Sequence, residues 1–149
     1  METAATATRY IQQMNTSKLV IEQQHADIID CCAALRMTLG PDAAIDDIGK
    51  VRMRLAKLLH ENLVSEEAAL NGPIRRLPFA KRPSSFGELG IEAADLRRKY
   101  TEHVGRWSLA AMSRDRQGYA ASAIELIAEV TSHLDRKRSA FPAWWAAIA

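Results

Sequence analysis

Apolar residues recur at intervals of three or four along four segments of the chain, the spacing that puts side chains on one face of an α-helix. No segment alternates apolar and polar residues for the length of a strand. The pattern predicts four helices: from Ser17 to Thr38, from the cap residue Asp42 to Leu70, from Ser85 to Arg114, and from Gly118 to Ala140. The predicted fold class is therefore all-α.

Each predicted helix has one stripe that should face a core, and three of the four stripes include a histidine. The stripes are Ile21, His25, Ile28, Ile29, Cys32 and Leu35; Ile48, Val51, Leu55, Leu58, Leu59, Asn62, Glu66 and Leu70; Leu96, Tyr100, His103, Trp107 and Ala111; and Ala123, Leu126, Val130, His133 and Lys137, flanked by Ile127 and Leu134. Four helices of this length, most of them joined by short turns, predict an up-down-up-down four-helix bundle over residues 17–149.

Glycine and proline mark the expected ends of these helices. Gly40-Pro41 should end the first helix and Asn71-Gly72-Pro73 the second, before a basic loop over residues 73–83. Ser85 and Glu88 have the spacing of a capping box for the third helix. Phe141-Pro142 should break the fourth and begin a short C-terminal helix that carries Trp144 and Trp145. Residues 1–16 are expected to be a flexible N-terminal segment.

Charge and composition narrow the classes of partner. The 20 Lys and Arg residues nearly balance the 18 Asp and Glu residues, which gives no reason to expect nucleic acid. No run of apolar residues is long enough for a membrane span, and the N-terminus lacks the pattern of a secretory signal. We therefore expect a cytoplasmic chain whose partner is another protein or a second copy of itself. The adjacent Cys31 and Cys32 are expected to be buried apolar residues, with a redox role as the alternative.

The inward-facing histidines and one glutamate are the candidate functional residues. His25, His103 and His133 share the core with Glu66, and a buried carboxylate is costly unless a cation pairs with it. Helix bundles hold metal ions by projecting His and Glu side chains inward from facing helices. His25, Glu66, His103 and His133 are therefore the candidate metal ligands.

The same residues give the chain a resemblance to hemerythrin-like (HHE cation-binding) domains, covering about residues 17–146. Four segments resemble the ligand segments of that family: Glu22-Gln23-Gln24-His25, Asn62-Leu63-Val64-Ser65-Glu66-Glu67, Glu102-His103-Val104-Gly105-Arg106-Trp107, and the ending from His133 to Phe141-Pro142. The resemblance implies a four-helix bundle around a di-iron site.

The chain departs from the family pattern at the ligand positions. Asn62 and Trp107 stand where the family has histidines, and Lys137 and Arg138 stand where it has acids. His60 is two residues from Asn62 and points to another side of the helix. We expect a vestigial site in which Arg138 or Lys137 neutralises Glu66. The predicted function is a non-catalytic binding or regulatory module without a cofactor. The alternative is an oxygen- or redox-sensing or metal-binding domain that holds a single Fe or Zn ion.

Overall fold

The computed structural model describes residues 3–149, and all regular structure in that range is helical. Four long helices dominate it: α1 (Ala4–Met37), α2 (Ile45–Glu66), α4 (Ser84–Arg106) and α6 (Arg116–Ala147). Short elements join them: a π-helical turn η1 (Glu67–Asn71), α3 (Gly72–Arg75), a 3-10 turn η2 (Phe79–Lys81) and α5 (Leu109–Arg114). None of the helices in residues 3–149 is both long and apolar enough to cross a bilayer.

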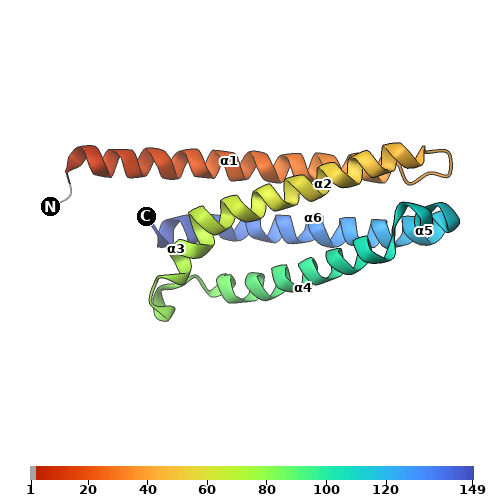
Figure 1. Ribbon diagram of the computed structural model, residues 1–149. Helices are drawn as coiled ribbons and strands as arrows, with labels where there is room; N and C mark the ends of the chain where they lie inside the picture. The colour runs from red at the N-terminus through yellow and green to blue at the C-terminus, as the bar shows by residue number, and fades with distance from the viewer. Residues whose placement is uncertain (1–2) are drawn as a thin grey trace.

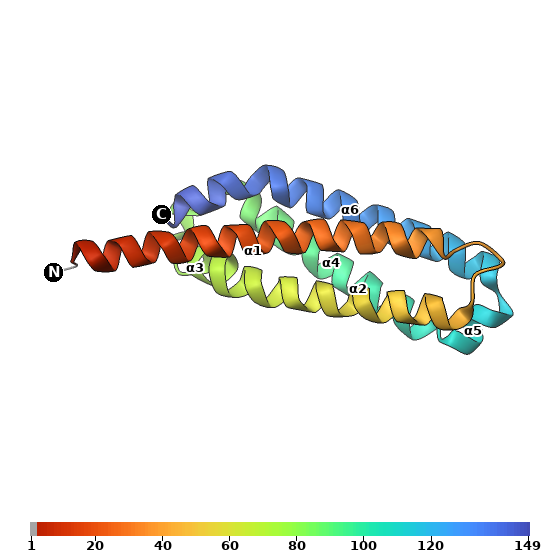
Figure 2. The ribbon, with the colours of Figure 1, turned by 90° about the horizontal axis from the view of Figure 1, so that it is seen from above.

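The four long helices lie side by side, as both ribbon views show (Figures 1 and 2). The main packed pairs are α1 with α2, α4 with α6, and α1 with α6. The first turns of α1 project past the end of the molecule where the C-terminus and α3 lie (Figures 1 and 2). Helices α2 and α4 pack against each other much less closely than these pairs do. The groove of the candidate site lies between them.

Two groups of buried side chains form the core. The larger group fills the middle and the α5 end, where Ile28, Leu55 and Val130 meet. The smaller group lies at the end of the chain termini and contains Leu70, Phe141 and Trp144. The predicted stripes are confirmed, since every residue in them is buried or half-buried. Cys31 and Cys32 are both buried and free, which confirms the expectation of small core residues.

The start of α1 differs from the prediction. The helix begins at Ala4 rather than at Ser17, and Thr3 caps it by accepting a hydrogen bond from the amide of Thr6 at 3.3 Å. Residues 3–13 are all exposed, so they contain no apolar stripe that periodicity can detect. The expected flexible segment is therefore helical from residue 4, while residues 1 and 2 lie outside the described range.

The predicted end of the second helix at Asn71-Gly72-Pro73 is also wrong. The chain stays helical to Arg75, because the π-helical turn η1 adds a residue and Pro73 then falls in the first turn of α3. The amide of Gly72 donates to the carbonyl of Glu67, five residues back. A Cβ at Gly72 would lie 2.9 Å from that carbonyl oxygen, so the close turn requires glycine.

Three further boundaries differ for local reasons. The third predicted helix is divided at Trp107, and Ser108 caps a separate α5. Phe141-Pro142 does not break α6, which continues to Ala147 and is visibly bent in Figure 2. The predicted caps Asp42 and Ser85 are wrong as well. The caps of α2 and α4 are Ala44 and Pro83 without side-chain bonds.

Candidate functional site

Glu66 is the centre of the candidate site. It ends α2, directly before the π-helical turn, and only 2% of its surface is exposed. Its Oε2 atom lies 2.6 Å from Nε2 of His25 on α1, and its Oε1 atom lies 2.5 Å from Nζ of Lys137 on α6. The expectation that a basic residue of the fourth helix neutralises Glu66 is confirmed for Lys137, whereas Arg138 is exposed.

The two partners decide the charge state of Glu66. Burial alone would raise the pKa of this carboxyl, since a charge is poorly solvated inside a protein. The hydrogen bond from His25 and the Lys137 ammonium outweigh burial, so the pKa of Glu66 lies below its ordinary value. Glu66 is therefore an anion that is satisfied by side chains of α1 and α6, and it ties three helices together.

His133 lies beside this centre and is oriented by a carboxylate from α4. Its Nδ1 atom is 2.6 Å from Oε1 of Glu92, which also accepts hydrogen bonds from Arg136. Because an ionised carboxylate only accepts, Nδ1 carries the hydrogen and Nε2 of the neutral ring is an acceptor. Burial lowers the pKa of His133, although the bond with Glu92 acts in the opposite direction.

Asn62 links α2 to α1. Its Nδ2 atom donates to Oε1 of Gln24 at 3.0 Å, and Nε2 of Gln24 donates to Oγ of Ser65 at 2.8 Å. Asn62 is only 4% exposed, so this chain of amide and hydroxyl groups satisfies polar atoms that would otherwise be buried without partners. Asn62 is thus part of a helix–helix contact.

His103 belongs to a different part of the molecule. Its Nδ1 atom lies 2.8 Å from Oγ of Ser122, and its ring packs against Tyr119 with centroids 5.7 Å apart. His103 is eleven residues from Glu92 along α4, which is about 16 Å of helix. Burial, reinforced by Arg52, lowers the pKa of His103 to about 4. The structure therefore does not bring His103 together with His133 and Glu66.

Of the other predicted site residues, only His25 and Glu66 are in direct contact. His133 and Lys137 of α6 line the same groove as Glu66. Within residues 3–149 no three His, Cys, Asp or Glu side chains are grouped so that they could hold a metal ion. Glu92 is not among the predicted site residues, although its spacing from Leu89 and Leu96 places it on the inner face of α4.

A groove between α2 and α4 leads down to this polar centre. Its volume is about 740 Å³, and Asn62, Glu66, His133 and Lys137 all line it. Most of the other lining side chains are apolar or aromatic and include Leu59, Leu63, Phe86, Leu89, Leu96, Tyr100 and Trp144. The polar centre is therefore reached from outside through an apolar opening.

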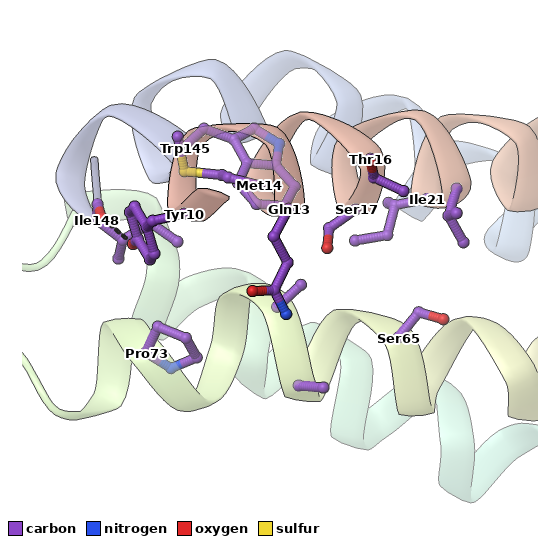
Figure 3. A pocket seen from close by; sticks show the side chains of 13 residues that line it. Tyr10, Gln13, Met14, Thr16, Ser17, Ile21, Ser65, Pro73, Trp145 and Ile148 are labelled. Atoms are coloured by element: carbon purple, nitrogen blue, oxygen red, sulfur yellow. Dashed lines mark hydrogen bonds between the residues drawn. The ribbon is translucent and has the colours of Figure 1, made fainter. Parts of the chain in front are cut away.

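A smaller pocket of about 360 Å³ lies at the terminal end, between α1, the π-helical turn and the end of α6. Figure 3 shows Gln13 extending from α1 across this pocket towards α2, with Tyr10 and Trp145 on one side. Tyr10 borders the pocket and donates a hydrogen bond to the carbonyl of Ile148 at 2.8 Å. No charged side chain lines this pocket, so it offers fewer groups for ligand binding or catalysis than the groove does.

Comparison of the chain with protein-family models, with curated proteins and with solved structures finds no match.

Proposed function

We propose that the chain is a hemerythrin-like four-helix bundle that acts as a non-catalytic binding or regulatory module. In this proposal α1, α2, α4 and α6 run up, down, up and down, and the metal centre has been replaced by an ion pair within the protein. Two features support the resemblance: His25 and Glu66 are adjacent in the core, and His133 approaches them from the last long helix.

One observation carries the proposal. Both carboxylate oxygens of Glu66 are bonded by side chains of the chain itself, Lys137 and His25. A lysine ammonium at this position supplies the positive charge that a buried carboxylate needs. The same ammonium repels a metal cation, so a metal ion has to displace Lys137 before it can reach Glu66.

A second candidate function has an observation of its own. Glu92 holds Nδ1 of His133 in the way that carboxylates orient metal-binding histidines, and it leaves Nε2 available. If Lys137 swings out, then Glu66, His25 and His133 are three donors for one Zn or Fe ion. This candidate is a single-metal or redox-sensing domain.

Metal analysis separates the two. The protein is purified from cells grown with added iron and zinc, and its metal content is measured by mass spectrometry. We expect much less than one ion per chain. One equivalent of Fe or Zn that is lost in His133→Ala, and retained in the control Asp135→Ala at an exposed position of α6 outside the groove, would establish the second candidate instead.

A further inference from the structure

The groove between α2 and α4 has room that the fold does not use. Two glycines of α4, Gly87 and Gly90, line it. A Cβ built at either position meets no atom within 4 Å. Neither glycine has a positive φ angle. Both glycines are exposed, so side chains at these positions would narrow the mouth of the groove, and glycine leaves it open.

The floor of the groove offers a ligand both a hydrogen-bond donor and a hydrogen-bond acceptor. Lys137 uses one of its N–H groups on Glu66, which leaves donors available at the groove. His133 is 5% exposed, and its Nε2 atom has no hydrogen-bond partner among the described residues. With Nδ1 donating to Glu92, Nε2 is an acceptor. An oxygen that accepts from Lys137 while its own hydrogen goes to His133 satisfies both groups.

The charge of the floor argues for an uncharged group. Glu66 neutralises Lys137, and Arg136 neutralises Glu92 at 2.6 Å. A ligand carboxylate at Lys137 would meet the charge of Glu66, and a ligand ammonium at Glu66 would meet that of Lys137. A neutral hydroxyl group avoids both charge repulsions. It can accept a hydrogen bond from Lys137 and donate one to His133.

We propose that the groove between α2 and α4 is a binding site for an apolar molecule that carries a neutral hydroxyl group, an alcohol or a phenol. The hydroxyl binds between Lys137 and His133, and the apolar body lies along Leu63, Leu89 and Trp144. A volume of about 740 Å³ is in the usual range for small-molecule sites, and a mostly apolar lining with a few convergent polar groups is typical of them. This inference rests on the proposed function, since it requires Lys137 to occupy the centre in place of a metal.

Three probes with one ring system test the ligand chemistry by isothermal titration calorimetry on the purified protein. The probes are 2-naphthol, 2-methoxynaphthalene, which lacks the donor hydrogen, and 2-naphthoate, which is an anion. We expect 2-naphthol to bind roughly threefold to tenfold more tightly than 2-methoxynaphthalene, the value of one hydrogen bond. 2-Naphthoate should be the weakest. Equal affinities for all three, or a preference for 2-naphthoate, would overturn the proposed chemistry.

Two matched glycine variants test the location. Gly90→Leu puts a side chain into the groove, whereas Gly105→Leu puts the same side chain on the exposed part of α4 outside it. Both positions have free space around a Cβ, and leucine favours helix, so both variants should fold with an unchanged or higher Tm. We expect Gly90→Leu to lose 2-naphthol binding at least tenfold and Gly105→Leu to keep it. Retained binding in Gly90→Leu would place the probe elsewhere.

Metal analysis and probe titration together distinguish failure of the ligand site from failure of the proposed function on which it rests. A metal-free protein that binds no probe retains the ion-pair centre but has no site for this ligand class. A protein with one equivalent of metal at Glu66 refutes both, because Lys137 then no longer occupies the floor.

Discussion

Lys137 and Glu66 form an ion pair in which the lysine side chain is 14% exposed and that of the glutamate 3% exposed, with Nζ and Oε1 2.5 Å apart. Removing two charges from water costs several kcal/mol per ion, and their attraction must offset that cost. A pair of this kind adds little net stability, but each partner depends on the other. This dependence makes the pair testable.

Lys137→Met should destabilise the protein by about 3–5 kcal/mol at pH 7, because it leaves Glu66 buried and charged with His25 as its one remaining partner. The measurement is guanidinium denaturation. Lys57→Met is the control, since Lys57 is exposed and 3.8 Å from Glu61, and it should cost less than about 1 kcal/mol. The double variant Glu66→Gln, Lys137→Met should recover much of the loss. A loss in Lys137→Met no greater than in the control would show that Glu66 does not depend on the pair.

Lys137→Glu should create a metal site. The change replaces the ammonium beside Glu66 with a carboxylate, which makes the new carboxylate, Glu66, His25 and His133 four candidate donors for one ion. We expect Zn²⁺ to raise the Tm of this variant by several degrees and to leave the unmodified protein unchanged. Lys137→Gln, which removes the cation without adding an anion, is the control. Equal shifts in the two variants would mean that the added carboxylate does not bind the ion together with Glu66 and His133.

Trp107→His, by contrast, should give no gain in metal affinity. The proposed resemblance to hemerythrin-like domains places a histidine at this position, but Trp107 packs edge-on against Tyr119 at 5.8 Å between centroids. It is fifteen residues beyond Glu92 along the chain, so it is on the order of 20 Å from the polar centre. Zn²⁺ titration of Trp107→His in the Lys137→Glu background tests this directly. An increased affinity would restore the family alignment of the third helix.

Acid should destabilise the fold through several buried groups, among them His103 and Glu66. Burial lowers the pKa of His103 to about 4, so the folded state resists a proton that the unfolded chain takes up at its ordinary value of 6.5. The stability that this neutral ring contributes is complete above pH 6.5 and is lost as the pH falls towards 4, at up to about 1.4 kcal/mol per pH unit. Glu66 has a lowered pKa, so its contribution is present above its ordinary value of 4.5 and is lost below that pH.

His103→Gln isolates the first of these effects. Denaturation of both proteins at pH 7.5, 6.5, 5.5 and 4.5 should show a smaller decline for the variant than for the unmodified protein between pH 6.5 and 4.5. His60→Gln, at an exposed position, should leave the decline as it is. Parallel curves for all three proteins would mean that His103 takes up its proton with equal ease in the folded and unfolded states.

Periodicity was enough to predict the inward faces of the helices, and the resemblance to hemerythrin-like domains led to the pairing of Glu66 with Lys137. Periodicity failed where one local interaction decided a boundary. Pro73 and Pro142 were expected to end helices, but a π-helical turn places the first in a tolerated position, and α6 accommodates the second by bending. The axial register of one helix against its neighbour also cannot be predicted from periodicity. His103 shares the stripe of Glu92, and only the packing of α4 on α6 shows that Glu92 is the residue that meets His133.

Tyr119→Phe should stabilise the protein. The hydroxyl group of Tyr119 and the indole N–H of Trp107 are buried, and neither has a hydrogen-bond partner within the described residues. Such a group loses its bonds to water on folding and gains nothing in return, whereas phenylalanine keeps the packing of the ring against Trp107 and His103. We expect a gain of about 1 kcal/mol in the free energy of unfolding, measured by guanidinium denaturation at pH 7. Tyr10→Phe is the matched control, because its hydroxyl donates to Ile148 at an exposed site, and it should be neutral or slightly destabilising. A loss of more than about 1 kcal/mol in Tyr119→Phe would mean that a buried water satisfies the hydroxyl, and that the region around Trp107 is hydrated.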